Sequence, residues 1–214
     1  MALIHRTTLK PTKVELLTDW LPTRPWYHGP AAPELVKAGG FRLDDPAGEV
    51  GIEFMVVTEG SGGSEGSGAY LVPLTYRGAP LEGAEHALVG TMEHGVLGTR
   101  WAYDGCHDPV LTTELLALIE GRAEAQAQSI TDTPDREVER SYAGQGPVTG
   151  LGAPVDTDGS TEFAVPDGGL VLRLRRVLTA GSTAPDDALG RITGAWQQPD
   201  GTRARAPFAT LQAL

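Results

Sequence analysis

The residues with the most chemical potential gather between His94 and Asp108. This stretch holds two histidines, two aspartates and the only cysteine of the chain: His94, Asp104, Cys106, His107 and Asp108. Histidine and carboxylate side chains suit zinc or iron, so His94, Asp104, His107 and Asp108 could be imagined as a metal site. The spacing of the histidines matches no standard metal-binding pattern, and Asp108, directly before Pro109, is placed to cap a helix. We therefore expect a polar cluster that joins a strand to a helix, and no bound metal.

Covalent and hydrolytic chemistry have less support. Cys106 and His107 are adjacent, and neighbouring side chains on an extended segment point to opposite faces, so they do not form a nucleophile–base pair by themselves. The sequence has no Gly-x-Ser-x-Gly elbow to hold a serine nucleophile. Carboxylates are plentiful, but no two are marked out as the facing pair that glycoside hydrolysis needs. We expect no catalytic residues in these patterns.

Aromatic residues form a second candidate group, made of Trp20, Trp26, Tyr27, Trp101 and Tyr103. Flat rings of this kind could pack on the apolar side of a sugar. Aromatic side chains also bury large areas in cores and at protein interfaces. The sequence leaves both alternatives open.

Alternating apolar residues predict the strands around these groups. Glu49–Thr58 is expected to be a half-buried strand, and Ala69–Tyr76 its return, with Pro73 placing the second strand at an edge or beside a bulge. The glycine-rich Glu59–Gly68 between them predicts a flexible hairpin loop, and it lacks the Gly-Lys-Ser/Thr of a phosphate-binding loop. Ala87–Glu93 and Val96–Tyr103 predict the next pair.

Helices are expected at two places. An apolar stripe begins after Asp108-Pro109 and continues to about Gln126, which predicts the main helix. A shorter amphipathic helix is predicted between Val14 and Leu21. Beyond position 158 the pattern is purely β, with strands predicted at Thr161–Val165, Leu170–Leu174, Arg191–Gln197 and Thr202–Leu211. The sequence therefore predicts an α+β fold: an antiparallel sheet packed by one main helix, with additional C-terminal hairpins.

The organisation predicted along the chain has three parts. Residues 1–127 are expected to form an α+β domain, and residues 128–157, which are polar and lack periodicity, a linker or excursion. Residues 158–214 are expected to be strands that either form a module or complete the same domain.

Composition excludes several classes of partner. The formal net charge of -11 argues against nucleic acid and anionic membranes, which need a basic surface. No stretch approaches the roughly 20 apolar residues of a membrane-spanning helix. A single cysteine excludes an internal disulfide and fits a reducing cytoplasm, and the first residues lack the apolar run of a signal peptide. We expect a soluble cytoplasmic protein.

Several short motifs resemble the N-terminal cap domain of bacterial maltokinases. These are LLTDWLPTRPWYHG, a strand with YLVPL, a strand with ALVGT, and the exit WAYDGCHDP. Trp20, Leu21, Trp26, Tyr27 and Gly29 fit the first motif. The resemblance covers roughly Lys13 to Gln126. It implies a curved antiparallel sheet with a helix against it. His28 stands where the family often has lysine, so no role of that lysine carries over.

The resemblance also implies a role in α-glucan, maltose or trehalose metabolism. A maltokinase makes maltose 1-phosphate from maltose and ATP in large lobes that follow its cap, and this sequence shows no nucleotide cradle, catalytic loop or metal-binding acidic motif. We expect no kinase activity and no cofactor, and leave other catalysis open. The first hypothesis is an accessory or regulatory protein that acts by contact with a maltokinase-like or other α-glucan enzyme, or as a homo-oligomer.

Two surfaces follow from these hypotheses. The contact surface is expected at Trp26, Tyr27, Arg100, Trp101 and Tyr103, because interfaces favour aromatic and arginine side chains at their centres. The alternative is a small sugar-binding protein or enzyme whose pocket is lined by the 94–108 stretch, with His94 and Asp104 as ligand contacts.

Overall fold

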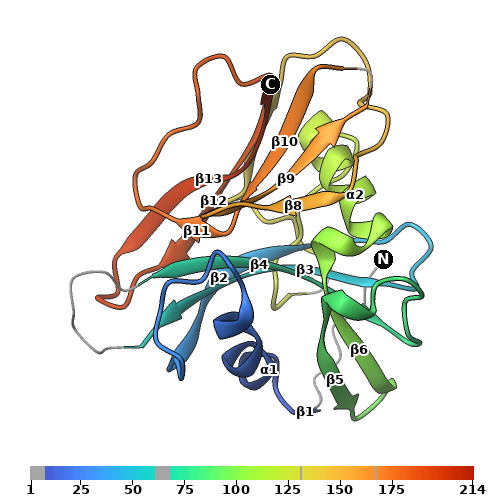
Figure 1. Ribbon diagram of the computed structural model, residues 1–214, viewed down its shortest axis with the longest axis vertical. Coiled ribbons are helices and arrows are strands. Elements are labelled where there is room, and N and C mark those ends of the chain that lie inside the picture. Colours follow the sequence, from blue (N-terminus) through green and yellow to red (C-terminus); the bar gives the residue numbers. More distant parts are fainter. Residues whose placement is uncertain (1–7, 61–67, 131, 167) are drawn as a thin grey trace.

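The computed structural model describes residues 8–60, 68–130, 132–166 and 168–214 (Figure 1). The middle of the predicted hairpin loop, residues 61–67, lies outside this part of the chain. The first half of the molecule contains β1 (Leu9–Lys10), α1 (Lys13–Trp20), β2 (Leu35–Leu43), β3 (Gly51–Glu59), β4 (Ala69–Arg77), β5 (Leu88–His94) and β6 (Gly98–Asp104). The second half contains α2 (Pro109–Glu120), β7 (Glu139–Tyr142), β8 (Pro154–Asp156), β9 (Ser160–Val165), β10 (Leu170–Arg175), β11 (Val177–Leu178), β12 (Gly190–Gln197) and β13 (Arg203–Ala213).

The described strands join in one antiparallel sheet. Its order is β1-β5-β6-β4-β3-β2-β12-β13-β10-β9-β8, with β11 paired to β4 and β7 paired to β12. The C-terminal strands therefore continue the sheet of the first half. Strands dominate and helices are few, so the fold is mostly β. The sequence predicted the antiparallel sheet, but it also predicted a larger share of helix than the structure has.

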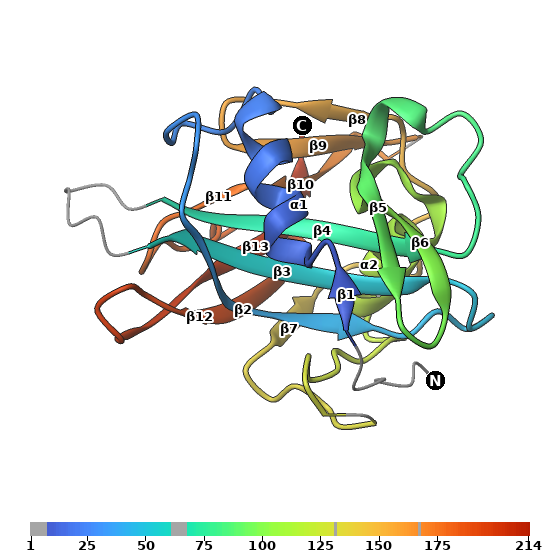
Figure 2. The ribbon, with the colours of Figure 1, turned by 90° about the horizontal axis from the view of Figure 1, so that it is seen from below.

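The sheet changes direction where its two halves meet. β2 and β12 share a single register pair, Trp196 opposite Gly39. Beyond that pair the strands of the two halves form separate layers, seen from the side in Figure 1 and from below in Figure 2. The large apolar core lies between these layers and includes the inner face of α2.

β3 and β4 are buried on both faces, whereas a half-buried strand was predicted for Glu49–Thr58. One face of β3, including Phe54, packs into the large core. The other, including Met55, packs with Leu17 of α1 and with Trp26 in a second apolar cluster. The sequence pattern predicted only the face with Val50, Ile52 and Phe54. The other face carries the polar Glu53, and its burial depends on α1, which packs on Met55 and Val57.

Pro73 lies inside the sheet, at an irregularity in the pairing of β4, so of the two predicted positions the edge is wrong. On one side β4 pairs with β3 along its length, with Pro73 opposite Phe54. On the other side its partner changes: the Leu71 amide donates to the Arg176 carbonyl, and pairing with β6 begins only at Leu74. Pro73 occupies the break between these partners, where no ladder bond needs its missing N–H.

α2 begins as predicted and ends earlier. Asp108 caps it by accepting from the Val110 amide, 3.0 Å away, and Pro109 occupies the first turn. The helix ends at Gly121, whose φ of 80° is the left-handed conformation that glycine adopts readily. The predicted end near Gln126 is therefore wrong. Among the described residues, no helix is long and apolar enough to cross a membrane.

Candidate functional site

Asp104 and Arg176 form a buried ion pair at the end of β6. The Arg176 Nη2 donates to Asp104 Oδ1 at 2.8 Å and to Oδ2 at 2.6 Å. Both side chains are buried: that of Arg176 is 0% exposed and that of Asp104 is 3% exposed. Asp104 also accepts from the Cys106 amide, which fixes the short turn Gly105–His107. The pair links β6 to the end of β10, 72 residues later in the chain.

The environment of Arg176 is polar on one side and aromatic on the other. Its Nε donates to Thr161 Oγ1 at 2.7 Å, and Thr161 in turn donates to Asp156 Oδ1 at 2.6 Å. Its guanidinium lies 4.9 Å from the ring centre of Trp26. Burial opposes the charge of Arg176, but the Asp104 carboxylate outweighs burial and raises its pKa. The cluster is therefore a charged structural link between the two halves of the sheet.

Asp108 also forms a buried ion pair, with Arg77. Its two carboxylate oxygens accept from Arg77 Nε and Nη2, each at 2.7 Å, while one of them also caps α2. The Asp108 side chain is fully buried. The hydrogen bonds to Asp108 raise the pKa of Arg77. This two-point contact ties the end of β4 to the start of α2.

The histidines of the stretch do not meet. His107 faces His86, with His86 Nε2 3.0 Å from His107 Nδ1, and burial lowers the pKa of His107. His94 lies in the β5–β6 turn, where its Nδ1 accepts from the amides of Val96 and Leu97. In the part of the chain that the structure describes, no three His, Cys, Asp or Glu side chains are placed to hold a metal.

The Cys106 thiol is buried, at 1% exposed, and burial raises its pKa. Because the thiolate is the reactive form, we expect native protein to react with a maleimide at least about a hundredfold more slowly than urea-unfolded protein. Mass spectrometry of timed reactions measures both rates. Equal rates in native and unfolded protein would show that the thiol is accessible and would contradict its structural role.

A second buried charge, Glu53 of β3, was not singled out from the sequence. Its carboxylate pairs with Lys13 and Lys37 and accepts from the Tyr76 hydroxyl at 2.8 Å and from Gln128 Nε2 at 3.0 Å. Burial raises its pKa, but the two lysines outweigh burial and lower the value to about 2. Its partners come from four separate segments, and for this reason no local motif marked it.

The predicted aromatic surface is not brought together. Trp26 is fully buried, with its ring 5.9 Å from that of Trp20. Tyr103 is buried in a separate small cluster against which Trp101 packs, and its hydroxyl accepts from the Leu81 amide. Tyr27 is half-buried, and its hydroxyl donates to Glu59. Burial, and after it the charge of Glu59, raises the pKa of Tyr27. Arg100 is half-buried on β6. Any contact role of these residues stays a prediction.

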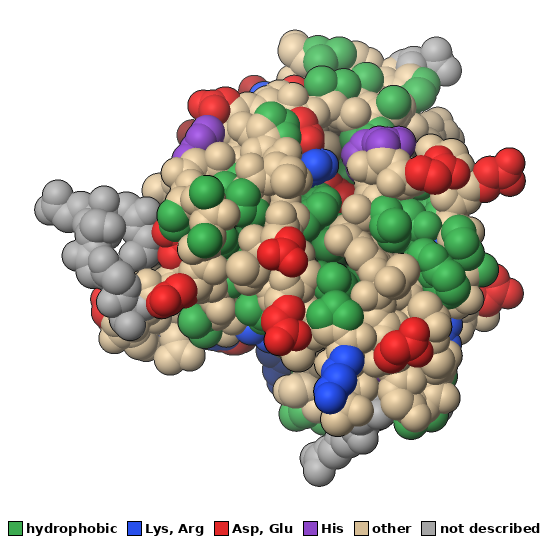
Figure 3. All heavy atoms as spheres, turned by 60° about the horizontal axis from the view of Figure 1, so that its bottom comes forward, with side chains coloured by type: hydrophobic (Ala, Val, Ile, Leu, Met, Phe, Trp, Pro, Cys, Tyr) green, Lys and Arg blue, Asp and Glu red, His purple; other side chains and the backbone are tan. Residues whose placement is uncertain are grey.

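The β5–β6 turn exposes apolar side chains instead. Val96 is 63% exposed and Leu97 is 45% exposed, at the end of a hairpin that extends from the body of the molecule (Figures 1 and 2). Figure 3 shows the face with α1 and this hairpin, where apolar side chains occur in groups between acidic ones. The two bonds to His94 hold the turn in one conformation. We call residues 94–98 the hairpin tip.

Comparison with known proteins finds a resemblance over part of the chain. The family model of the maltokinase N-terminal cap domain matches residues 20–108. That segment, from the end of α1 to the cap of α2, therefore resembles this domain, as the motifs predicted. Arg176, the buried ion-pair partner of Asp104, lies outside it, as does Thr161, which accepts a hydrogen bond from Arg176. No curated protein matches the chain.

Proposed function

We propose that the protein is a non-catalytic accessory protein that acts by contact with an enzyme of α-glucan, maltose or trehalose metabolism. The match of residues 20–108 to a maltokinase cap domain supports an association with enzymes of that kind. The proposal includes a bacterial cytoplasmic setting, which the single cysteine favours. A second copy of the chain is the other partner that this proposal admits.

The hairpin tip is the observation that carries this proposal. Asp104 and Asp108 of the matched segment are used inside the molecule, each in a buried ion pair. The tip instead presents Val96 and Leu97 to solvent on a turn fixed by its own hydrogen bonds. A rigid apolar projection loses little conformational freedom on binding, and interface centres are apolar.

We expect Val96→Asp to weaken binding of a purified maltokinase-type enzyme from the same organism about thirtyfold, the size of a hot-spot loss. Val155→Asp is the matched control, because Val155 is 61% exposed but lies on β8. Calorimetry measures both affinities, and thermal unfolding checks that both variants fold. Equal affinities for Val96→Asp and the control would show that the hairpin tip is not part of the interface.

The alternative, a sugar pocket lined by residues 94–108, has less support. Tyr103 and Asp104 are buried and bonded inside the protein, and His94 bonds the turn that contains it. A calorimetric titration with maltose, trehalose, glucose 1-phosphate and ATP compares the two proposals. Binding of one of them that His94→Ala abolishes would favour the pocket over the contact surface.

A further inference from the structure

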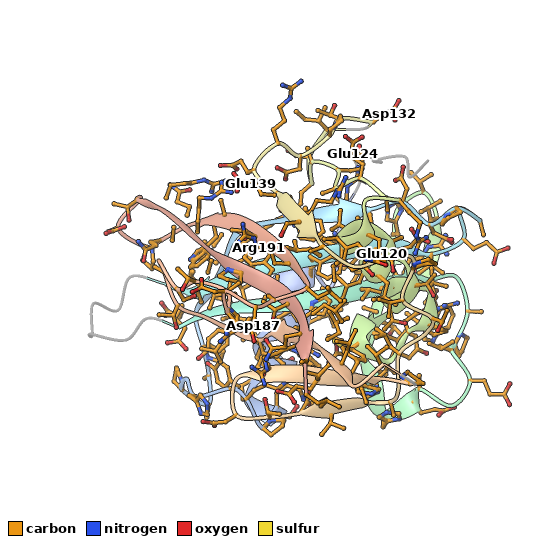
Figure 4. All side chains as sticks on the ribbon, turned by 90° about the horizontal axis from the view of Figure 1, so that it is seen from above. Glu120, Glu124, Asp132, Glu139, Asp187 and Arg191 are labelled. Atoms are coloured by element: carbon orange, nitrogen blue, oxygen red, sulfur yellow. The ribbon has the colours of Figure 1, made fainter. Side chains whose placement is uncertain are left out.

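A cavity of about 440 Å³ lies where the two halves of the sheet meet, away from the 94–108 stretch. Its floor comes from Gly39, Gly40 and Phe41 of β2, with Ala195 of β12 and Phe208 of β13. Its wall comes from the segment between α2 and β7, through residues 127–129 and 133–138. Figure 4 shows this segment above the strands, with Glu124 and Asp132 on it and Glu139 where it enters β7.

The sheet geometry explains why this space exists. β2 and β12 pair only at Gly39 and Trp196, and the register of β2 against β3 shifts between Lys37 and Gly39. Gly40 has a φ of 116°, and a Cβ there would lie 1.9 Å from the Phe54 carbonyl oxygen. Glycines inside a strand cost stability and commonly mark a bulge or the close approach of a ligand or another backbone. Here both glycines line the cavity, where β2 approaches the backbone of its neighbouring strands.

Hydrogen bonds within the protein hold the wall of the cavity in place. Gln126 pairs with Arg42 of β2 and with Pro134, and the Ala127 amide donates to the Thr133 carbonyl at 2.8 Å. Arg42 Nε donates to the Ala127 carbonyl at 3.1 Å. Gln128 reaches the buried Glu53 with its amide nitrogen. The cavity is therefore formed in advance, which lowers the entropic cost of binding.

The charges around the cavity balance. Asp135 and Glu137 are opposed by Arg136 and Arg203, and Arg203 Nε lies 3.1 Å from Glu137 Oε1. The chain carries a net charge of -11, which disfavours an anionic ligand. The remaining polar groups of the lining are hydroxyl and backbone groups, such as the exposed Ser129, and the Gln128 side chain, whose amide nitrogen already bonds Glu53. They lie above a floor of small and apolar residues. Hydrogen-bonding groups without net charge suit an uncharged ligand with many hydroxyls.

We propose that this cavity binds a neutral polyhydroxylated compound, of the size of a mono- or disaccharide. A volume of about 440 Å³ falls within the range of small-molecule sites, roughly 300–1,000 Å³. The proposal does not depend on the contact at the hairpin tip, because the cavity lies on other strands. The sugar-binding proposal can therefore fail while the contact proposal holds, and the reverse.

Calorimetry on the full chain, with glucose, maltose, trehalose and the anionic glucose 1-phosphate as probes, tests the proposal. We expect at least one neutral sugar to bind with a Kd of about 1 mM or tighter. Ser129→Trp, an exposed position in the wall, should fill the opening and weaken binding at least about tenfold. Thr113→Trp, exposed on α2, adds the same bulk elsewhere and should leave the affinity unchanged.

Hydrogen exchange on the wild-type protein gives a second measurement that needs no variant. The bound sugar should slow amide exchange across residues 127–138. Three outcomes overturn the proposal: no neutral sugar binds at about 10 mM, glucose 1-phosphate binds more tightly than every neutral sugar, or a bound sugar leaves exchange in residues 127–138 unchanged.

Discussion

Replacing Arg176 with methionine is expected to lower the free energy of unfolding by about 3–5 kcal/mol. Methionine keeps much of the volume but leaves the Asp104 carboxylate, 3% exposed, without its counter-charge. It also leaves the Thr161 hydroxyl without its donor and removes the cation above Trp26. Urea unfolding followed by circular dichroism measures the change.

Two further variants isolate the cause of this loss. Arg173→Met removes an ion pair with Glu162 that is about a third exposed, and it should cost less than about 1 kcal/mol. Adding Asp104→Leu to Arg176→Met removes the unpaired buried charge, so the double variant should recover part of the stability. A loss for Arg176→Met no larger than that for Arg173→Met would contradict the structural role of the buried pair.

Acid should destabilise the protein through Glu53. Its pKa is lowered from 4.5 to about 2 in the folded state, so the folded protein binds fewer protons than the unfolded chain in this range. A depressed pKa stabilises the fold above the unfolded value and loses that contribution as the pH falls through the folded value. The difference corresponds to about 3 kcal/mol, present above about pH 4.5 and lost progressively toward pH 2.

The matched measurement is urea unfolding of wild type, Glu53→Gln and Glu124→Gln between pH 2 and 7. Glu53→Gln should be less stable at pH 7, because Lys13 and Lys37 lose their counter-charge, and its stability should fall less toward low pH. Glu124→Gln, an exposed position, should follow wild type. Parallel pH curves for wild type and Glu53→Gln would show that Glu53 does not carry the acid dependence.

Much of the fold follows from local pattern. Alternation predicted β3, β4, β10, β12 and β13, and the Asp-Pro pair predicted the start of α2. β2 was missed because the glycines at 39 and 40 interrupt its pattern. β7 and β8 lie in the segment predicted to be irregular, and both are very short strands. β8 pairs with β9, the next strand along the chain, whereas β7 pairs with the distant β12. Pairing between distant segments leaves no local signal.

The site could be predicted only in outline. The polar cluster at the exit of β6 was expected, but its partner was not, because Arg173, Arg175 and Arg176 look alike in sequence. One signal was present: Arg176, directly after β10, continues the alternation of the buried Leu172 and Leu174. An arginine in that phase must find a buried acid. Trp26 could not be distinguished from a surface aromatic, because its burial depends on α1 and on β3 and β4 packing around it.

The central claim, that this protein works by contact, is tested most directly by sedimentation velocity. The purified chain is run alone, and then with a maltokinase-type enzyme from the same organism. The account predicts a faster-sedimenting complex in the mixture, or a dimer of the chain itself, at micromolar concentration. A chain that sediments as a monomer in both runs, independently of the enzyme, would contradict it.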